Sequence, residues 1–173
     1  ISLMMCADVP SYEGAKFDPR LECDIGFVGG YWPYKGQVIN EYLFPLLDPI
    51  NRYKVKIFGN QPWPVNQYCG VLPDEDVYAG GFCISDNVES YKMFGDGLVI
   101  ADSPEDFREK IDYYLANPEE AAKIATKGQR CVRQNHTGFH RVMKILKELG
   151  LESLSDRLAD GLKEYEDDFY AAH

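Results

Sequence analysis

The stretch that decides the fold is Cys23-Asp24-Ile25-Gly26-Phe27-Val28-Gly29-Gly30-Tyr31, a short apolar run that ends in two adjacent glycines. Such a run is typical of a strand buried on both faces of a parallel sheet. A helical pattern follows from Lys35. A strand, a glycine loop and a helix N-terminus favour phosphate binding, because the glycines let a ligand approach the backbone and the helix presents unpaired N–H groups. We therefore predict a ligand crevice beside Gly29 and Gly30, with Lys35 near it; a plain turn and a solvated lysine are the alternative.

The composition excludes several classes of protein. The chain has 173 residues, of which 45% are hydrophobic, so it forms one domain or one domain with an appendage. The net charge of −10 argues against non-specific binding of nucleic acid or of an anionic membrane surface. Five scattered cysteines without a C-x-x-C pair indicate reduced thiols. No apolar run approaches the ~18 residues of a membrane span, and no signal peptide is visible, so we expect a cytoplasmic protein.

Apolar runs alternate with helical patterns along the chain. Strands are expected at residues 23–29, 53–58, 68–72, 80–85 and 97–101. Helices are expected at residues 35–48, 87–94, 103–116, 118–134, 137–149 and 151–169. This order predicts an α/β fold with a Rossmann-like open parallel sheet and a helical C-terminal extension. The domains are then a linker at 1–22, the Rossmann-like domain at 23–150 and a C-terminal helix at 151–173.

Glycines also follow later strands. In open α/β sheets ligands bind outside the carboxyl ends of the strands, and Gly59 lies at such an end, as Gly29 and Gly30 do. The pattern is neither G-x-G-x-x-G nor a Walker motif, which argues against a nicotinamide or flavin enzyme and against a P-loop NTPase. His136 and His140 lie four residues apart, but no further ligand completes a metal set, so we interpret His136 as part of the cap region at Thr137 and predict no metal site.

The connection before Gly80 is unusually short. About eight residues separate two expected strands there, whereas a parallel crossover needs roughly a dozen. Two explanations are open: the two strands are antiparallel with a wide loop, or residues near 77–80 are missing from the chain.

Four motifs together resemble the C-terminal domain of spore-maturation-protein-like (CgeB-like) glycosyltransferases, which have the GT-B fold. Their order and spacing carry more weight than any one of them. They are the opening run Asp24–Gly30, the "CGGF-x-x-x-D" strand at Gly80–Asp86, the pieces Phe94–Asp96 and Ser103–Leu115, and the "HT-x-x-HR" signature at His136-Thr137 and His140-Arg141.

The resemblance implies a function. In that family the C-terminal domain binds a nucleotide-sugar donor, and an N-terminal domain of the same protein binds the acceptor that receives the sugar. The donor would be a co-substrate, and no cofactor or metal is implied. The implied donor-binding residues are Gly29, Gly30, Tyr31 and Lys35 at the diphosphate, Gly59 in the same crevice, Gly70, Val71 and Leu72 along the base, and Gly81 near the sugar or ribose.

The chain departs from the family in the segment before Gly80. The family has a short run there with an Arg and a ribose-binding Glu, whereas Val77-Tyr78-Ala79 stands in this position. We also expect the N-terminal acceptor domain, and any general base, to lie outside this chain, so that the isolated chain is inactive and its catalytic residues are unknown. A non-catalytic α/β module that binds a nucleotide or a partner is the alternative, and a fucosyltransferase-like donor domain is a third possibility.

Overall fold

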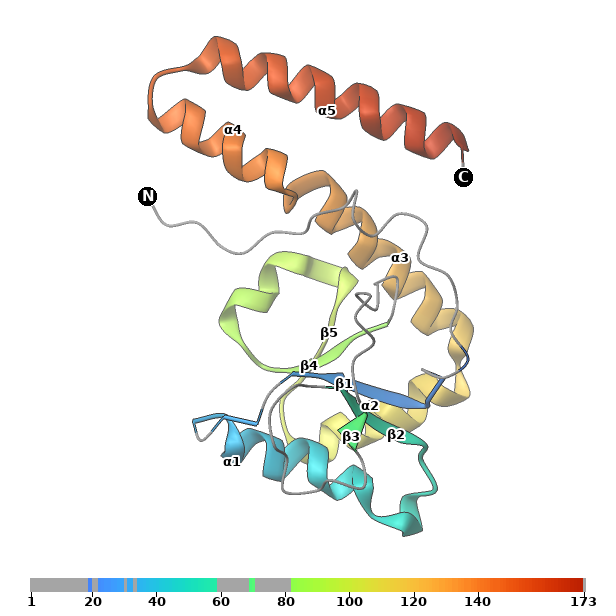
Figure 1. Cartoon of the computed structure of the whole chain (residues 1–173). Coiled ribbons are helices and arrows are strands. Elements are labelled where there is room, and N and C mark those ends of the chain that lie inside the picture. Colours follow the sequence, from blue (N-terminus) through green and yellow to red (C-terminus); the bar gives the residue numbers. More distant parts are fainter. Residues whose placement is uncertain are drawn as a thin grey trace. The chain divides into compact units, whose positions relative to one another are not determined.

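The computed structural model describes residues 19, 22–29, 31, 32, 34–58, 69, 70 and 82–172 (Figure 1). These residues fall into two compact units, one within residues 14–128 and one within residues 129–173. All the strands belong to the first unit, and the second is helical.

The strands of the first unit form two small parallel sheets. One has the order β1-β2-β3 and the other pairs β4 with β5. Their bounds are Ile25–Val28 (β1), Val55–Phe58 (β2), Cys69–Gly70 (β3), Ile84–Asp86 (β4) and Val99–Ala101 (β5). The five expected strands are therefore present and each pairing is parallel, which confirms a mixed α/β fold. The prediction of a single open sheet is confirmed only in part. Within the described residues, no strand-to-strand hydrogen bonds join the three-stranded sheet to the two-stranded sheet.

The segment between β3 and β4 spans residues 71–83. The strands are shorter than expected, so this connection reaches the length that a parallel crossover needs. None of the described strand pairs is antiparallel. The predicted gap near residues 77–80 lies outside the described residues and stays a prediction.

Strand β1 is covered on one face. Ile25 and Phe27 pack against the hydrophobic core. Gly26 and Val28 are exposed, and 63% of Val28 is accessible. Successive side chains of a strand point to opposite faces, and the described core lies only on the Ile25 and Phe27 side. The prediction of burial on both faces is therefore wrong for β1.

A helical run of mixed geometry follows β1. It begins as α1 (Gly36–Val38), widens to the π-helix η3 (Ile39–Leu43) and tightens to the 3-10 helix η4 (Phe44–Leu47). Pro45 lacks an N–H and cannot continue an α-helix at this point, and the Phe44 N–H reaches back to the Ile39 carbonyl.

The core of this unit lies between the helical run, β2 and α2 (Pro104–Ala116). A short 3-10 turn, η5 (Pro49–Asn51), leads from the run toward β2. The buried hydrophobic side chains of this core are Ile39, Leu43, Leu46, Leu47, Ile57 and Ile111.

Between β4 and β5 lies the 3-10 segment η7 (Glu89–Gly97), which kinks at Gly95, where φ is +51°. Ser103 caps α2, because its Oγ accepts the Asp106 N–H at 3.1 Å. Asn117 then separates α2 from α3 (Pro118–Asn135). Leu115, near the end of α2, is exposed.

Gly97 and Gly128 allow η7 and α3 to touch through their backbones. A Cβ placed on Gly97 would lie 2.4 Å from the Gly128 Cα, and a Cβ on Gly128 would lie 2.4 Å from the Gly97 carbonyl oxygen. Real Cβ atoms do not approach so closely, so both positions require glycine.

The second unit is a helical hairpin. Helix α4 (Gly138–Glu148) packs against α5 (Glu152–Ala172), and Gly150, at φ +71°, lies in the turn between them. Ser155 is fully buried and donates to the Met143 carbonyl at 3.3 Å, while Leu162 is buried farther along α5. Across the described residues, no helix has the length and apolar character that crossing a membrane requires.

The glycine contact gives a first prediction. Gly128→Ala should lower the free energy of unfolding by about 1–3 kcal/mol, because the new methyl group overlaps the Gly97 carbonyl. Gly161→Ala is the matched control: it also lies inside a helix but meets no atom within 4 Å, so it should gain up to about 1 kcal/mol of helix propensity. Urea unfolding followed by circular dichroism measures both. Equal effects of the two substitutions would refute the contact.

Candidate functional site

The carboxyl end of β1 lies beside the carboxyl ends of β2 and β3. The Gly29 N–H donates to the Phe58 carbonyl at 2.9 Å, and Gly70 stands opposite Phe58 in the β2–β3 register. Two predicted site residues, Gly29 and Gly70, therefore lie at one sheet edge with Phe58 between them. A Cβ on Gly29 would lie 3.1 Å from the Phe27 ring, so this position favours glycine on packing grounds as well.

Tyr31 connects the loop after β1 to the helical run. Its ring stacks on Phe44, with centroids 5.9 Å apart and planes 6° apart. Its hydroxyl donates to Asn40 Oδ1 at 3.4 Å. A Cβ on Gly36 would lie 3.1 Å from the same hydroxyl. Packing thus accounts for the position of Tyr31, and its predicted contact with a donor stays a prediction.

Lys35 occupies the residue that precedes α1. Its side chain is exposed, and its Nζ lies 5.9 Å from the centroid of the Tyr34 ring. The Lys35 ammonium group is therefore open to solvent, and its contact with a ligand stays a prediction. The remaining predicted site residues lie outside the described part of the chain; they are Gly30, Gly59, Val71, Leu72 and Gly81.

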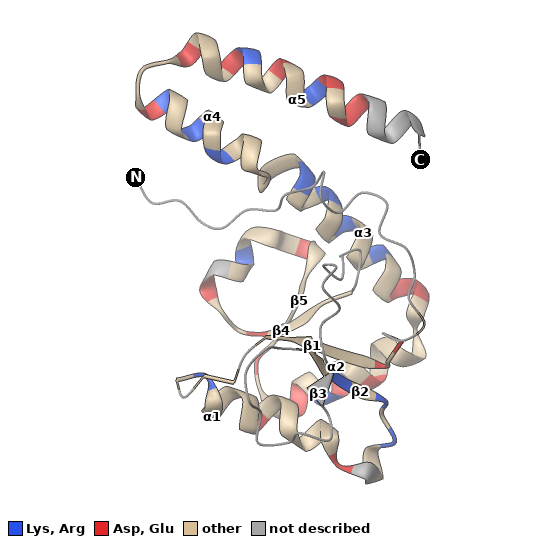
Figure 2. Cartoon of the chain, in the orientation of Figure 1, with Lys and Arg blue, Asp and Glu red and all other residues tan. Residues whose placement is uncertain are grey.

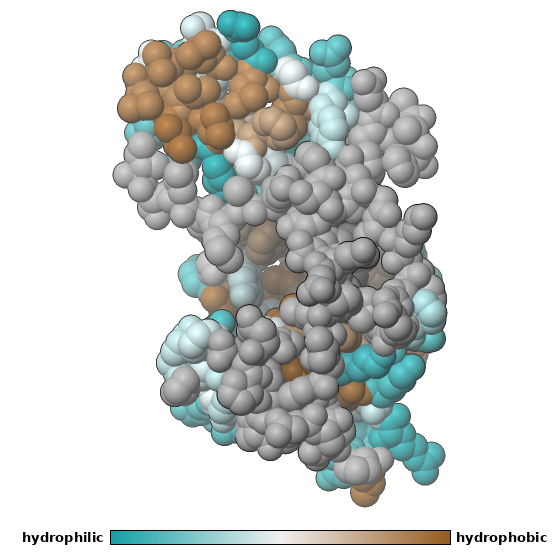
Figure 3. All heavy atoms as spheres, in the orientation of Figure 1, coloured by the Kyte–Doolittle hydropathy of each residue, from teal (hydrophilic) through white to brown (hydrophobic). Residues whose placement is uncertain are grey.

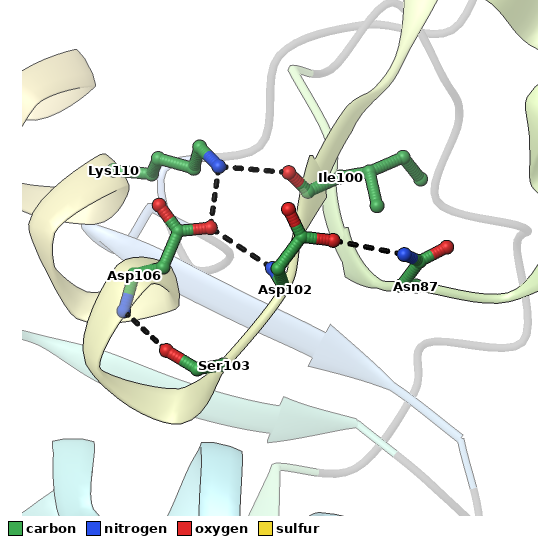
Figure 4. Close-up of polar contacts among 6 residues, drawn as sticks. All are labelled: Asn87, Ile100, Asp102, Ser103, Asp106 and Lys110. Carbon is green, nitrogen blue, oxygen red and sulfur yellow. Dashed lines mark hydrogen bonds and ion pairs between the residues drawn. The ribbon is translucent and has the colours of Figure 1, made fainter.

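A polar network joins the carboxyl ends of β4 and β5 (Figure 4). Asn87, directly after β4, donates through Nδ2 to Asp102 Oδ1 at 2.8 Å. The backbone N–H of Asp102, directly after β5, donates to Asp106 Oδ2 at 2.9 Å. The two loops are therefore fixed to each other and to the first turn of α2.

Lys110 completes this network from the second turn of α2. Its Nζ donates to the Ile100 carbonyl at 2.9 Å and to Asp106 Oδ2 at 2.5 Å (Figure 4). The hydrogen bond from Lys110 lowers the pKa of Asp106, and the bond from the Asp102 backbone N–H lowers it further. Asp106 and Lys110 lie four residues apart on a helix, a spacing visible in the sequence. The Asn87–Asp102 contact joins residues of two loops, and no spacing in the sequence predicts it.

The edge formed by β4 and β5 is acidic. Burial raises the pKa of Tyr42, and the charges of Asp86, Glu41, Asp102 and Glu105 raise it further. Tyr42 packs edge-on against Phe107, with centroids 5.4 Å apart. This edge therefore suits hydroxyl groups of a ligand better than its phosphates, whereas Lys35 offers a positive charge near β1.

The His-Thr and His-Arg pairs form the start of α4. Thr137 is buried, and its N–H and Oγ lie 3.4 Å and 2.7 Å from His140 Nδ1. This is a capping box with His in the place usually held by Glu or Gln. Arg141 lies 3.2 Å from His136 Nδ1 and donates to the Asn135 carbonyl. The predicted cap at Thr137 is confirmed. Within the described residues, no three His, Cys, Asp or Glu side chains gather as metal ligands would.

Comparison with family models gives a match to part of the chain. Residues 75–147 match the family model described as glycosyl transferase-like. The matched segment contains β4, β5, α2, α3 and most of α4, and it excludes the loop after β1. No match was found among curated proteins or among solved structures. The family match supports a glycosyltransferase, and with it a transferase activity in general.

The pKa shifts of the two histidines at the cap of α4 predict how the free energy of unfolding depends on pH. Burial lowers the pKa of His136 and of His140, and the Arg141 charge lowers both further, while a backbone hydrogen bond to Gln134 opposes the shift at His140. A histidine whose pKa is depressed by folding contributes full stability above about pH 6.5 and loses it as pH falls toward the folded pKa.

We therefore expect the hairpin to lose stability as pH falls from 7.5 to 5, by at most about 1.4 kcal/mol per histidine per pH unit. The double variant H136Q/H140Q keeps an amide acceptor at the cap and removes both titrations, so its loss should be smaller. Thermal unfolding of the two proteins at each pH measures the difference. Parallel pH curves would contradict the role given to these side chains.

Proposed function

We propose that the chain is the donor-binding domain of a nucleotide-sugar-dependent glycosyltransferase of the GT-B type, similar to the CgeB-like family. The match over residues 75–147 supports the enzyme class. The pattern of parallel strands supports the assignment to a donor domain.

The strand pairing is the observation that carries this proposal. The two pieces, β1-β2-β3 and β4-β5, are those obtained when a doubly wound sheet of order 3-2-1-4-5 is divided between β1 and β4. Ile25 and Phe27 of β1 and Ile84 of β4 pack against the same core cluster. We therefore infer that β1 and β4 are neighbours in the complete sheet. The chain reverses its direction of winding between them, and ligands of such folds bind at that point.

The charges on the β1 side and on the β4 side of this position suggest the orientation of a bound nucleotide-sugar donor. The diphosphate would bind on the β1 side, at Gly29, Gly30, Tyr31 and Lys35. Hydroxyl groups of the sugar or ribose would face the acidic β4–β5 edge, where Asp86 and Asp102 accept hydrogen bonds. Gly59, Gly70, Val71, Leu72 and Gly81 keep the roles that the family resemblance implies.

The proposed reaction moves a sugar from the nucleotide to an acceptor. The bond between the anomeric carbon and the β-phosphate oxygen breaks, its electron pair leaves with the nucleoside diphosphate, and the acceptor oxygen forms the new bond while losing its proton. Backbone N–H groups and a lysine ammonium group stabilise the charge that develops on the leaving group. We assign the acceptor site to an N-terminal domain and name no base in this chain.

A non-catalytic nucleotide-binding module is the second candidate. It is favoured by one observation, the absence of the ribose-binding Glu where Val77-Tyr78-Ala79 precedes Gly80. The two candidates differ in whether bound donor is consumed when an acceptor is present.

Calorimetry of the full-length protein with UDP-, GDP- and dTDP-sugars tests donor binding. Lys35→Ala should weaken the preferred donor about tenfold or more, because it removes one charge-assisted contact with a phosphate. Lys123→Ala removes an exposed lysine of α3 and should leave the affinity unchanged. Gly30→Val should abolish binding by filling the approach to the backbone.

Absence of heat with all three donor classes would refute the proposal. Unchanged affinity in Lys35→Ala and Gly30→Val would remove the loop after β1 from the site. Binding without release of nucleoside diphosphate, across a panel of acceptors, would favour the non-catalytic module.

A further inference from the structure

The loop between β1 and α1 contains three aromatic residues, and only the first of them is used in packing. The Tyr31 ring stacks on Phe44, and its hydroxyl donates to Asn40. Trp32 and Tyr34 are exposed, with 44% and 77% of their surfaces accessible. Neither the Trp32 indole N–H nor the Tyr34 hydroxyl has a hydrogen-bond partner in the part of the chain that the structure describes. The loop therefore presents two aromatic rings, each with a free polar group.

Hydrogen bonds and a ring contact hold this loop in place. The Lys35 N–H donates to the Trp32 carbonyl at 2.9 Å, which closes a turn with Tyr34 as its third residue. The Lys35 carbonyl then accepts the Ile39 N–H at 3.0 Å, so the turn leads directly into the helical run. The Lys35 Nζ lies 5.9 Å from the centroid of the Tyr34 ring, within the range of a cation–π contact. A loop that is already ordered loses less conformational entropy when it binds a ligand.

The two rings differ in chemistry from the exposed apolar surface elsewhere. Figure 3 shows a broad hydrophobic area over α4 and α5, where exposed side chains such as Val142 and Leu149 carry no polar atoms. Trp32 and Tyr34 combine a flat ring with a hydrogen-bonding group, and Lys35 adds a positive charge beside the Tyr34 ring (Figure 2). This combination fits a sugar, because its C–H groups can lie against the negative face of an aromatic ring while its hydroxyl groups bond to the N–H and O–H groups at the ring edges.

The two rings lie at the end of β1, apart from the predicted position of the nucleotide base. Trp32 follows Gly29 by three residues, so its Cα lies within about 11 Å of the Gly29 Cα. In the proposed function the diphosphate lies at Gly29 and Lys35, and the base lies along Gly70, at the end of β3. Strands β1 and β3 are separated by β2, and therefore by about 10 Å. The rings are thus placed at the diphosphate end of the donor, which is the end where the sugar is transferred.

We propose that Trp32 and Tyr34 stack against the sugar rings of a carbohydrate acceptor, so that this chain forms one side of the acceptor site. The inference rests on the proposed function, because it takes the acceptor to bind next to the diphosphate end of the donor. It adds the chemical class of the acceptor, a saccharide, and two residues that select it.

Steady-state kinetics of the full-length protein test the proposal, with the preferred nucleotide-sugar as donor and cellobiose, maltose and chitobiose as acceptors. Trp32→Ala and Tyr34→Ala should each raise the acceptor KM about five- to tenfold, because each removes one stacking ring. The value of kcat should stay nearly unchanged, since neither ring touches the reacting atoms. Trp32→Phe and Tyr34→Phe keep a ring and should recover most of the acceptor affinity.

Tyr113→Ala is the matched control. Tyr113 is also exposed, at 49%, but it lies near the end of α2 and its hydroxyl donates to Glu120 at 2.9 Å. Its replacement should leave the acceptor KM unchanged. Calorimetry of every variant with the donor alone should give the wild-type affinity, which separates the acceptor site from the donor site. Circular dichroism spectra that equal the wild-type spectrum exclude loss of folding.

Four outcomes would overturn the proposal. An unchanged acceptor KM in both alanine variants removes the rings from the acceptor site and leaves the donor site standing. A loss of donor affinity in these variants assigns the rings to the donor. Transfer to a polypeptide or a lipid, but to none of the saccharides, excludes a carbohydrate acceptor. Absence of donor binding in the wild type refutes the proposed function, and this inference with it.

Discussion

The first unit depends on the burial of Ile57 in the middle of β2. This side chain has no accessible surface, and it packs with Leu46 of the helical run and Ile111 of α2. Strand β2 pairs with β1 on one side and β3 on the other. One apolar residue thus holds the central strand against two helical segments that are far apart in the sequence. The positions of Gly29 and Gly70 at the sheet edge follow from the pairing that this burial secures.

The sequence predicted the elements better than their environment. Apolar runs with glycines after them located the strands, and the helices expected from residues 103, 118 and 137 begin within one residue of those positions, because capping and proline effects act within a few residues. Burial was less predictable. Val28 is exposed although it is as apolar as Phe27, since the number of layers that cover a strand is a property of the fold and not of the strand.

The candidate site shows the same limit. Gly29 could be assigned to a strand end from the local pattern alone, whereas Gly70 was expected inside the strand at residues 68–72 and lies at the end of β3. The contact between Asn87 and Asp102 could not be predicted, because these residues meet only once β4 and β5 have paired in the observed register. The change from π to 3-10 geometry before Asp48 was also missed, although Pro45, which explains it, is visible in the sequence. The family match covers the β4–β5 side of the site and leaves the β1 side to the physical argument.

The contact between Gly97 and Gly128 also restricts the length of the chain. Helix α3 begins at Pro118, and each added or deleted residue between Pro118 and Gly128 would turn the following part of the helix by about 100°. A residue with a side chain would then face the Gly97 backbone. The first turns of α3 should accept many substitutions at exposed positions such as Lys123 but no insertions or deletions. The contact between Gly97 and Gly128 therefore requires a constant number of residues between Pro118 and Gly128.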